Sequence, residues 1–209
     1  MQRNRGSRFF PLFVAFVVFI LIVVAIVSIG RAIFSGSQKD TTEDTADHGR
    51  QQLLVTDAGS SVVLTTRGPI VSRENFRSYQ VVVSPTQRSM TVYKGYLESV
   101  DKNTTLPNDQ KAYEQFVYAL DKANMMKGKV PADDSKNDLR GICSSGYVYE
   151  YTVRSGDNPV KRLWTSTCDG SKGTLDASVS QLNGLFFKQI PDADKIDPFA
   201  SVNANPLKF

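Results

Sequence analysis

The chain has 209 residues, of which 41% are hydrophobic and 22% are charged, and its formal net charge is +4. This length accommodates one globular domain with an appendage, but hardly two domains. From residue 52 onward, 19 Lys and Arg residues face 17 Asp and Glu residues, so the main part of the chain is almost neutral. Electrostatic binding of nucleic acid needs a strongly basic surface, and we therefore expect no nucleic-acid partner.

The first feature along the chain is an apolar run from Phe9 to Gly30 that contains no charged residue. As a helix this run is roughly 33 Å long, which matches the hydrocarbon core of a bilayer. We predict an uncleaved transmembrane signal anchor over residues 9–34. A cleaved signal peptide is the alternative, because Ser28 and Gly30 are small residues that suit a peptidase, but such a peptide has an apolar core of only about 7–15 residues.

The charges that flank the apolar run predict its orientation. Arg3, Arg5 and Arg8 precede it, whereas an acidic stretch follows it. Positively charged flanks stay in the cytoplasm. Residues 1–8 are therefore expected in the cytoplasm and the rest of the chain outside it, on a single-pass protein of the plasma membrane whose first partner is the lipid bilayer.

Three further segments are predicted after the anchor. Residues 35–51 are polar and read as a flexible linker. This linker contains His48, the only histidine of the chain, which we expect to be solvated. An extracytoplasmic domain over residues 52–195 and a C-terminal tail over residues 196–209 complete the chain.

Apolar periodicity within the domain predicts the order strand, strand, strand, helix, strand, strand, helix. The expected strands are 61–66, 77–84, 89–97, 147–153 and 160–168, and the expected first helix is 107–126. A last helix is expected between a capping Thr174 and Pro191. Antiparallel strands with helices packed on one face bury these apolar stripes most simply, so the predicted fold is a two-layer α+β domain.

The two cysteines bracket the second predicted hairpin. If its turn is centred on Ser155 and Gly156, Cys143 faces Cys168, and by the same register Tyr147 faces Trp164 and Glu150 faces Lys161. A turn centred one residue later would leave the cysteines diagonal but still close. Together with the expected export, this geometry predicts a structural disulfide between Cys143 and Cys168.

The same register places four aromatic side chains on one face of the sheet: Tyr147, Tyr149, Tyr151 and Trp164. The simplest interpretation is a core-facing surface beneath a helix. The alternative is an exposed aromatic face that binds a ligand. The opposite face, with Val148, Leu163 and the expected Glu150–Lys161 pair, reads as a mixed surface.

The residue types of the domain leave little room for catalysis. The domain lacks histidine, which excludes Ser-His-Asp machinery and the usual zinc sites, and it contains no phosphate-binding loop or dinucleotide motif. We therefore predict no catalytic, cofactor-binding or metal-binding residues and no cofactor. The remaining candidates are the acidic groups Asp133, Asp134 and Asp138, and Asp192, Asp194 and Asp197, which we expect to be solvated loop charges.

These observations favour a non-catalytic binding or envelope-assembly domain whose partner is another membrane or envelope protein. A carboxylate-based hydrolase outside the cytoplasm is the competing interpretation. The N-terminal apolar helix and late cysteine pair superficially resemble a type IV pilin, but Pro11 stands where that family has glutamate. Small exported domains of this strand and helix order also include protease inhibitors, which is a likeness of fold alone.

Overall fold

The computed structural model describes residues 48–131 and 137–200. The predicted anchor over 9–34 and most of the predicted linker lie outside these residues. Within them, no helix has the length and apolar character that crossing a membrane requires. The described residues belong to one compact unit with its own core.

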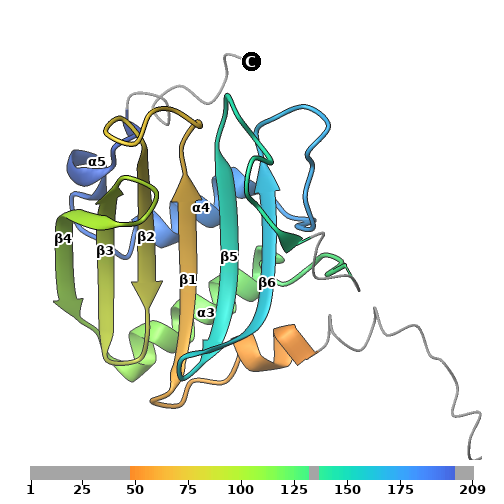
Figure 1. Ribbon diagram of the computed structural model, residues 1–209. Helices are drawn as coiled ribbons and strands as arrows, with labels where there is room; N and C mark the ends of the chain where they lie inside the picture. Colours follow the sequence, from red (N-terminus) through yellow and green to blue (C-terminus); the bar gives the residue numbers. More distant parts are fainter. Residues whose placement is uncertain (1–47, 132–136, 201–209) are drawn as a thin grey trace, which may run out of the picture. The chain divides into compact units, whose positions relative to one another are not determined.

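A six-stranded antiparallel sheet forms one layer of the domain, as Figure 1 shows. Its strands lie in the order β4-β3-β2-β1-β5-β6, so that β1 is central and β4 and β6 form the edges. The strand bounds are Ser60–Arg67 for β1, Arg77–Val83 for β2, Gln87–Lys94 for β3, Ser99–Pro107 for β4, Val148–Ser155 for β5 and Asn158–Ser166 for β6.

Strand β4 was not predicted from the sequence. Its nine residues are Ser-Val-Asp-Lys-Asn-Thr-Thr-Leu-Pro, and most of them are exposed. An edge strand with both faces in contact with water carries no alternating apolar signal, and charged side chains such as Lys102 protect such an edge from further pairing. No strand was therefore predicted where the structure has β4.

The first long helix, α3, spans Gln110–Lys122 and confirms the predicted amphipathic stripe. The side chain of Asp109 caps its start by accepting a hydrogen bond from the backbone of Ala112 at 2.9 Å. The helix ends before the predicted residue 126 because Asn124 adopts a left-handed conformation, with φ 60°. Met125 then donates its backbone N–H to the carbonyl of Leu120, which is the pattern of a Schellman motif.

The second long helix, α4, spans Val179–Phe187 and begins later than predicted. Ser178 caps it, whereas Thr174, the predicted cap, accepts a hydrogen bond from the backbone of Trp164 and ties this segment to β6. A short helix, α5, follows over Ala193–Ile196. The prediction of a cap at Thr174 was wrong because a capping-type side chain can equally satisfy a strand.

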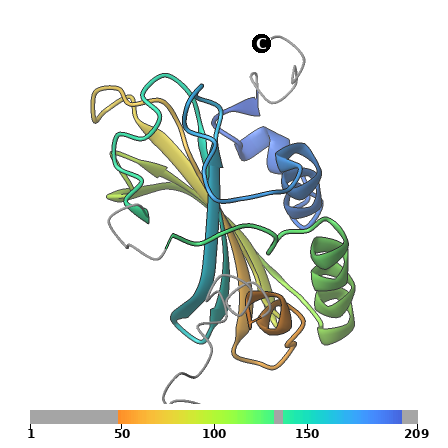
Figure 2. The same ribbon diagram turned by 90° about the vertical axis from the view of Figure 1, so that its right-hand side faces the viewer.

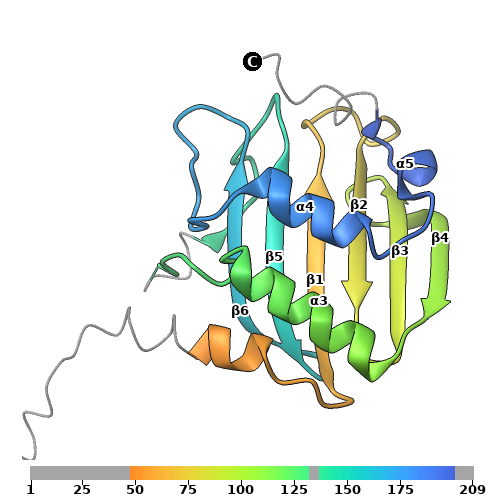
Figure 3. The ribbon, with the colours of Figure 1, turned by 180° about the vertical axis from the view of Figure 1, so that it is seen from behind.

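All these helices pack on one face of the sheet, which Figures 2 and 3 show from the side and from behind. The core lies between the two layers and includes the perpendicular rings of Phe116 and Phe186, 5.3 Å apart. Residues 48–53 are also helical and contribute the buried Leu53, although the sequence predicted a flexible linker up to residue 51. At the other end, Phe199 belongs to the core although it lies in the predicted tail.

The predicted register of the β5–β6 hairpin was wrong. Tyr151 pairs with Leu163 and Glu150 pairs with Trp164. Ser155 and Asn158 close a turn later than the one preferred from the sequence, and a bulge next to Val153 shifts the register further. Because side chains alternate between faces, this shift changes which residues share a face.

Candidate ligand-binding cavity

The face of the sheet without helices is polar, and it faces the viewer in Figure 1. One row of residues in register crosses five strands of this face, from the edge strand β4 to β5: Asn103, Thr91, Gln80, Thr65 and Glu150. Gln80 donates to Thr65 at 3.1 Å and Thr91 donates to Asn103 at 3.0 Å. The row ends at the buried Glu150, in the floor of a cavity.

This cavity has a volume of about 1030 Å³ and lies over the ends of β1, β5 and β6. Its floor includes Arg67, Val148, Glu150 and Arg162, and two loops form its walls. One loop, residues 68–76, follows β1, and the other, residues 137–146, precedes β5. The cavity is therefore built from segments that are far apart in the sequence.

Three links hold the wall at residues 137–146 in place. The first is the predicted disulfide between Cys143 and Cys168, which the structure confirms, with 5.4 Å between the two Cα atoms. Ser171 donates a hydrogen bond to the carbonyl of Ile142 at 3.0 Å. Ile70 donates its backbone N–H to the carbonyl of Ser144 at 2.9 Å, which joins the two walls to each other.

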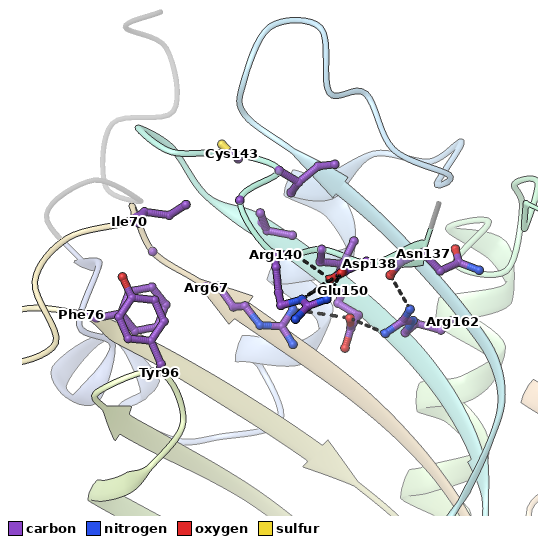
Figure 4. A pocket seen from close by; sticks show the side chains of 15 residues that line it. Arg67, Ile70, Phe76, Tyr96, Asn137, Asp138, Arg140, Cys143, Glu150 and Arg162 are labelled. Carbon is purple, nitrogen blue, oxygen red and sulfur yellow. Dashed lines mark hydrogen bonds and ion pairs between the residues drawn. The ribbon is translucent and has the colours of Figure 1, made fainter. Parts of the chain in front are cut away.

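Glu150 occupies the charged end of the cavity between two arginines, as Figure 4 shows. Its Oε2 lies 3.5 Å from Arg67 and 3.4 Å from Arg162. Both contacts are longer than a strong charge-assisted hydrogen bond of about 2.8 Å. Arg162 also donates to the carbonyl of Asn137 at 2.7 Å, which fixes its guanidinium beside the wall.

Asp138 and Arg140 form a separate ion pair at the rim. The guanidinium of Arg140 donates to both carboxylate oxygens of Asp138, to Oδ1 at 3.0 Å and to Oδ2 at 2.8 Å and 2.5 Å. The hydrogen bonds from the Arg140 side chain and backbone lower the pKa of Asp138 to about 2. Asp138 therefore stays ionised at neutral pH and holds no proton that it could donate to a substrate.

An aromatic pair forms the other end of the cavity. The rings of Phe76 and Tyr96 stack with centroids 3.9 Å apart. Tyr96 lies in a turn in which three consecutive residues have positive φ, namely 63° at Gly95, 54° at Tyr96 and 72° at Leu97. Such a conformation costs a non-glycine residue about 1–2 kcal/mol, and the hydrogen bond from the Tyr96 hydroxyl to the carbonyl of Val71 at 2.7 Å helps to hold it.

The four aromatic residues singled out in the sequence do not share a face. Tyr149 and Tyr151 are buried in the core beneath the helices, and Tyr147 packs against the same core at its margin. Trp164 lies on the helix-free face and packs with Val148 and Cys143. The corrected register explains this separation, because Trp164 pairs with Glu150 rather than with a tyrosine.

The same correction separates Glu150 from Lys161. Lys161 lies on the helix side, where it is buried and donates to the carbonyl of Met126 at 2.8 Å. The residues that replace it beside Glu150, Arg67 and Arg162, were missed in the sequence. The sequence offered one signal for them, because Glu150 stands between two tyrosines that are both buried. A carboxylate buried in such a strand needs a cationic partner.

The acidic candidates are dispersed. Asp133 and Asp134 lie outside the described residues, and Asp138 reaches the cavity. Asp192, Asp194 and Asp197 lie in and around α5, which packs on the helix side. Among the described acidic residues, Asp138 and Glu150 are thus the pair that lines a common cavity.

No protein-family model matches the chain, and no curated protein matches it in sequence. The chemistry of the cavity itself must therefore support any functional conclusion. The cavity combines an aromatic end, a buried carboxylate between two arginines and an ionised aspartate at its rim.

Proposed function

We propose that this protein is a membrane-anchored binding protein whose extracytoplasmic, non-catalytic domain holds a ligand or an envelope partner in the cavity of the helix-free face. The observation that carries the proposal is the cavity itself, with a floor of paired charges and a wall fixed by a disulfide. Cavities of this size with a few converging polar groups are the usual form of a ligand site.

The state of the charged groups favours binding over catalysis. General acid catalysis requires a group that holds a proton near the working pH. Asp138 has a pKa of about 2 and fails this requirement. Glu150 is held between Arg67 and Arg162, an arrangement that suits recognition of a complementary charge.

The membrane anchor and the exported location rest on the sequence. Basic residues before the apolar run and acidic residues after it support an N-terminus in the cytoplasm. The disulfide agrees with this placement, because such bonds persist in oxidising compartments. Labelling of a cysteine introduced at Tyr118, an exposed position of α3, should occur in intact cells, and labelling only after lysis would contradict the topology.

Site-specific photocrosslinking in native membranes tests the cavity as the binding site. A photoreactive residue at Ile70, which is 44% exposed at the rim, should give one discrete adduct. The same residue at Tyr118, which is 54% exposed on α3, is the matched control and should give no such adduct. Equal adducts from both positions, or none from Ile70, would contradict the proposal.

A carboxylate-based hydrolase is the second candidate, because Asp138 and Glu150 line the same cavity. Hydrolysis by a carboxylate pair requires one of the two to be protonated. The pairing of Asp138 with Arg140 opposes this role. An Asp138→Asn variant that still bound the crosslinked ligand but no longer hydrolysed it would favour the hydrolase over the binding protein.

A further inference from the structure

We propose that the cavity recognises a peptide carboxylate that is attached to an apolar group, with Arg67 and Arg162 binding the carboxylate and the Phe76–Tyr96 pair binding the apolar group. This inference rests on the proposed function, because it requires the cavity to be a ligand site. Four features of the described residues support it in turn: charge, donor geometry, the aromatic end and the size of the cavity.

The charge balance at the floor of the cavity is positive. Glu150 is one carboxylate opposite two guanidinium groups, and the ion pair of Asp138 with Arg140 adds no net charge. Glu150 itself is buried, with 7% of its surface exposed. A second carboxylate, supplied by a ligand, would therefore neutralise the remaining positive charge in a partly desolvated place, where charge pairing is stronger than in water.

The donor geometry leaves room for that second carboxylate. Arg67 and Arg162 both contact the same oxygen of Glu150, each at 3.4–3.5 Å and each through one nitrogen. A guanidinium carries five N–H donors, and its strongest contacts with carboxylates are bidentate. Neither arginine is bidentate to Glu150, so Arg67 can turn a pair of donors toward an incoming carboxylate. Arg162, whose second nitrogen is held by the carbonyl of Asn137, adds a fixed positive charge beside it.

The aromatic end supplies the second recognition element. Phe76 is buried, and its stacked partner Tyr96 is 45% exposed in a strained turn. The hydrogen bond between Tyr96 and Val71 holds this ring at the cavity instead of letting it relax. Figure 4 shows Arg67 between the aromatic pair and Glu150, so a carboxylate on Arg67 places its neighbouring group against the rings.

The size of the cavity favours a peptide over a small free acid. A volume of about 1030 Å³ is at the upper end of the range for small-molecule sites. Such a volume has room for the peptide groups that adjoin the bound carboxylate.

The only tryptophan of the chain provides the readout. Trp164 packs with Val148 and Cys143, both of which line the cavity. The full chain in lipid nanodiscs is titrated with two matched peptide pairs free of tryptophan. One pair carries an internal Phe-Glu or Phe-Gln, and the other ends in phenylalanine as a free acid or as an amide. Benzoate serves as a free organic acid.

The expected result is saturable fluorescence change with at least one carboxylate peptide, at an affinity at least about tenfold above that of its neutral partner. The peptide pair that shows the difference identifies whether the bound carboxylate belongs to a side chain or to the C-terminus of a peptide. Weak or absent binding of benzoate is expected. Tighter binding of benzoate than of every peptide would overturn the peptide assignment.

Substitutions at three positions separate the roles of the charges. Arg67→Gln and Arg162→Gln should each weaken the affinity for the carboxylate peptide at least about tenfold. The corresponding lysine variants should have affinities between those of the wild type and the glutamine variants, because lysine keeps the charge but cannot form two parallel hydrogen bonds. Glu150→Gln should tighten binding, because it removes the competing carboxylate. Arg50→Gln, on the helix side, is the matched control and should change nothing.

Each contrary result overturns a different statement. The carboxylate assignment fails if acid and neutral peptides bind equally. It also fails if Glu150→Gln weakens peptide binding although circular dichroism shows that this variant is folded. In both cases the cavity remains a ligand site. If no peptide binds and crosslinking from Ile70 also fails, the proposed function fails with it.

Discussion

The two faces of the sheet bury their residues in different ways. The helix-covered face is a continuous apolar and aromatic core closed by α3 and α4. The helix-free face buries Thr65, Thr152 and Glu150 almost as completely, although no described helix covers them. There, the loops of the cavity surround Glu150, and polar side chains form hydrogen bonds along one row.

This contrast indicates that the two faces of the sheet have different roles, one in stability and the other in binding. The covered face supplies the stability of the fold, because apolar burial contributes roughly 25 cal/mol for each Å² removed from water. The open face retains polar and charged groups that would add little to stability. Polar and charged residues that are retained although they add little to stability are the ones expected to have a role in binding.

The largest expected effect comes from breaking the covered face. Phe186→Ala removes a fully buried ring that packs against Phe116 and should lower the free energy of unfolding by about 3–5 kcal/mol. Phe76→Ala, at the cavity, is the matched substitution and should cost clearly less, because its ring, although buried, packs on the 45% exposed Tyr96 outside the main core. Denaturant unfolding of both variants measures the difference, and equal costs would refute the contrast between the faces.

The disulfide is expected to have the next largest effect. Replacing Cys143 and Cys168 together with alanine opens a loop of 25-residue separation and should lower the free energy of unfolding by about 3 kcal/mol. The fold should persist at low temperature, because the bond lies outside the main core. Wild-type protein unfolded under reducing conditions is the control and should behave like the double variant. An unchanged unfolding midpoint would show that the bond contributes nothing.

High pH should act on the covered face. Burial raises the pKa of Tyr149 to about 12 and raises that of Tyr151 as well. The unfolded chain then releases these protons first, so stability is intact below the normal tyrosine pKa and falls as pH rises toward the folded value. The expected loss is about 1.4 kcal/mol per pH unit for each buried phenol.

Tyr149→Phe isolates one of these contributions. The variant should show a shallower loss of stability between about pH 10 and pH 12, measured by denaturant unfolding at several pH values. The same slope in variant and wild type would mean that Tyr149 ionises without unfolding the domain.

Low pH should act on the open face, with the smallest effect. The lowered pKa of Asp138, about 2, means that its pairing with Arg140 is complete above the normal aspartate range and is lost as pH falls through that value. Because the pair is solvated, Arg140→Gln should leave the unfolding midpoint unchanged. The measurable effect is a rise of the Asp138 pKa in an NMR titration, and no rise would contradict the pairing.

The sequence predicted the covered face better than the open one. The stripe of α3 and the alternation of β2 and β3 were readable because one side of each element is apolar. Strand β4 has no such side, and the bulge next to Val153 leaves no mark in composition. Periodicity therefore detects elements that face a core and misses those that face water on both sides.

The cavity was out of reach for a related reason. Arg67 and Arg162 meet Glu150 only through the pairing of β1 with β5 and of β5 with β6. A register error moves each of these side chains to the other face. The disulfide was nevertheless predicted, because two cysteines at the base of a hairpin stay close in neighbouring registers.

The disulfide also sets a condition on any ligand of the cavity. It fixes the wall at residues 137–146, so a ligand that contacts this wall binds the oxidised protein more tightly than the reduced one. Thermodynamic reciprocity then requires the ligand to protect the bond from reduction by the same factor. A tenfold preference corresponds to about 30 mV in the two-electron potential of the cysteine pair, so the occupied protein should be the harder one to reduce.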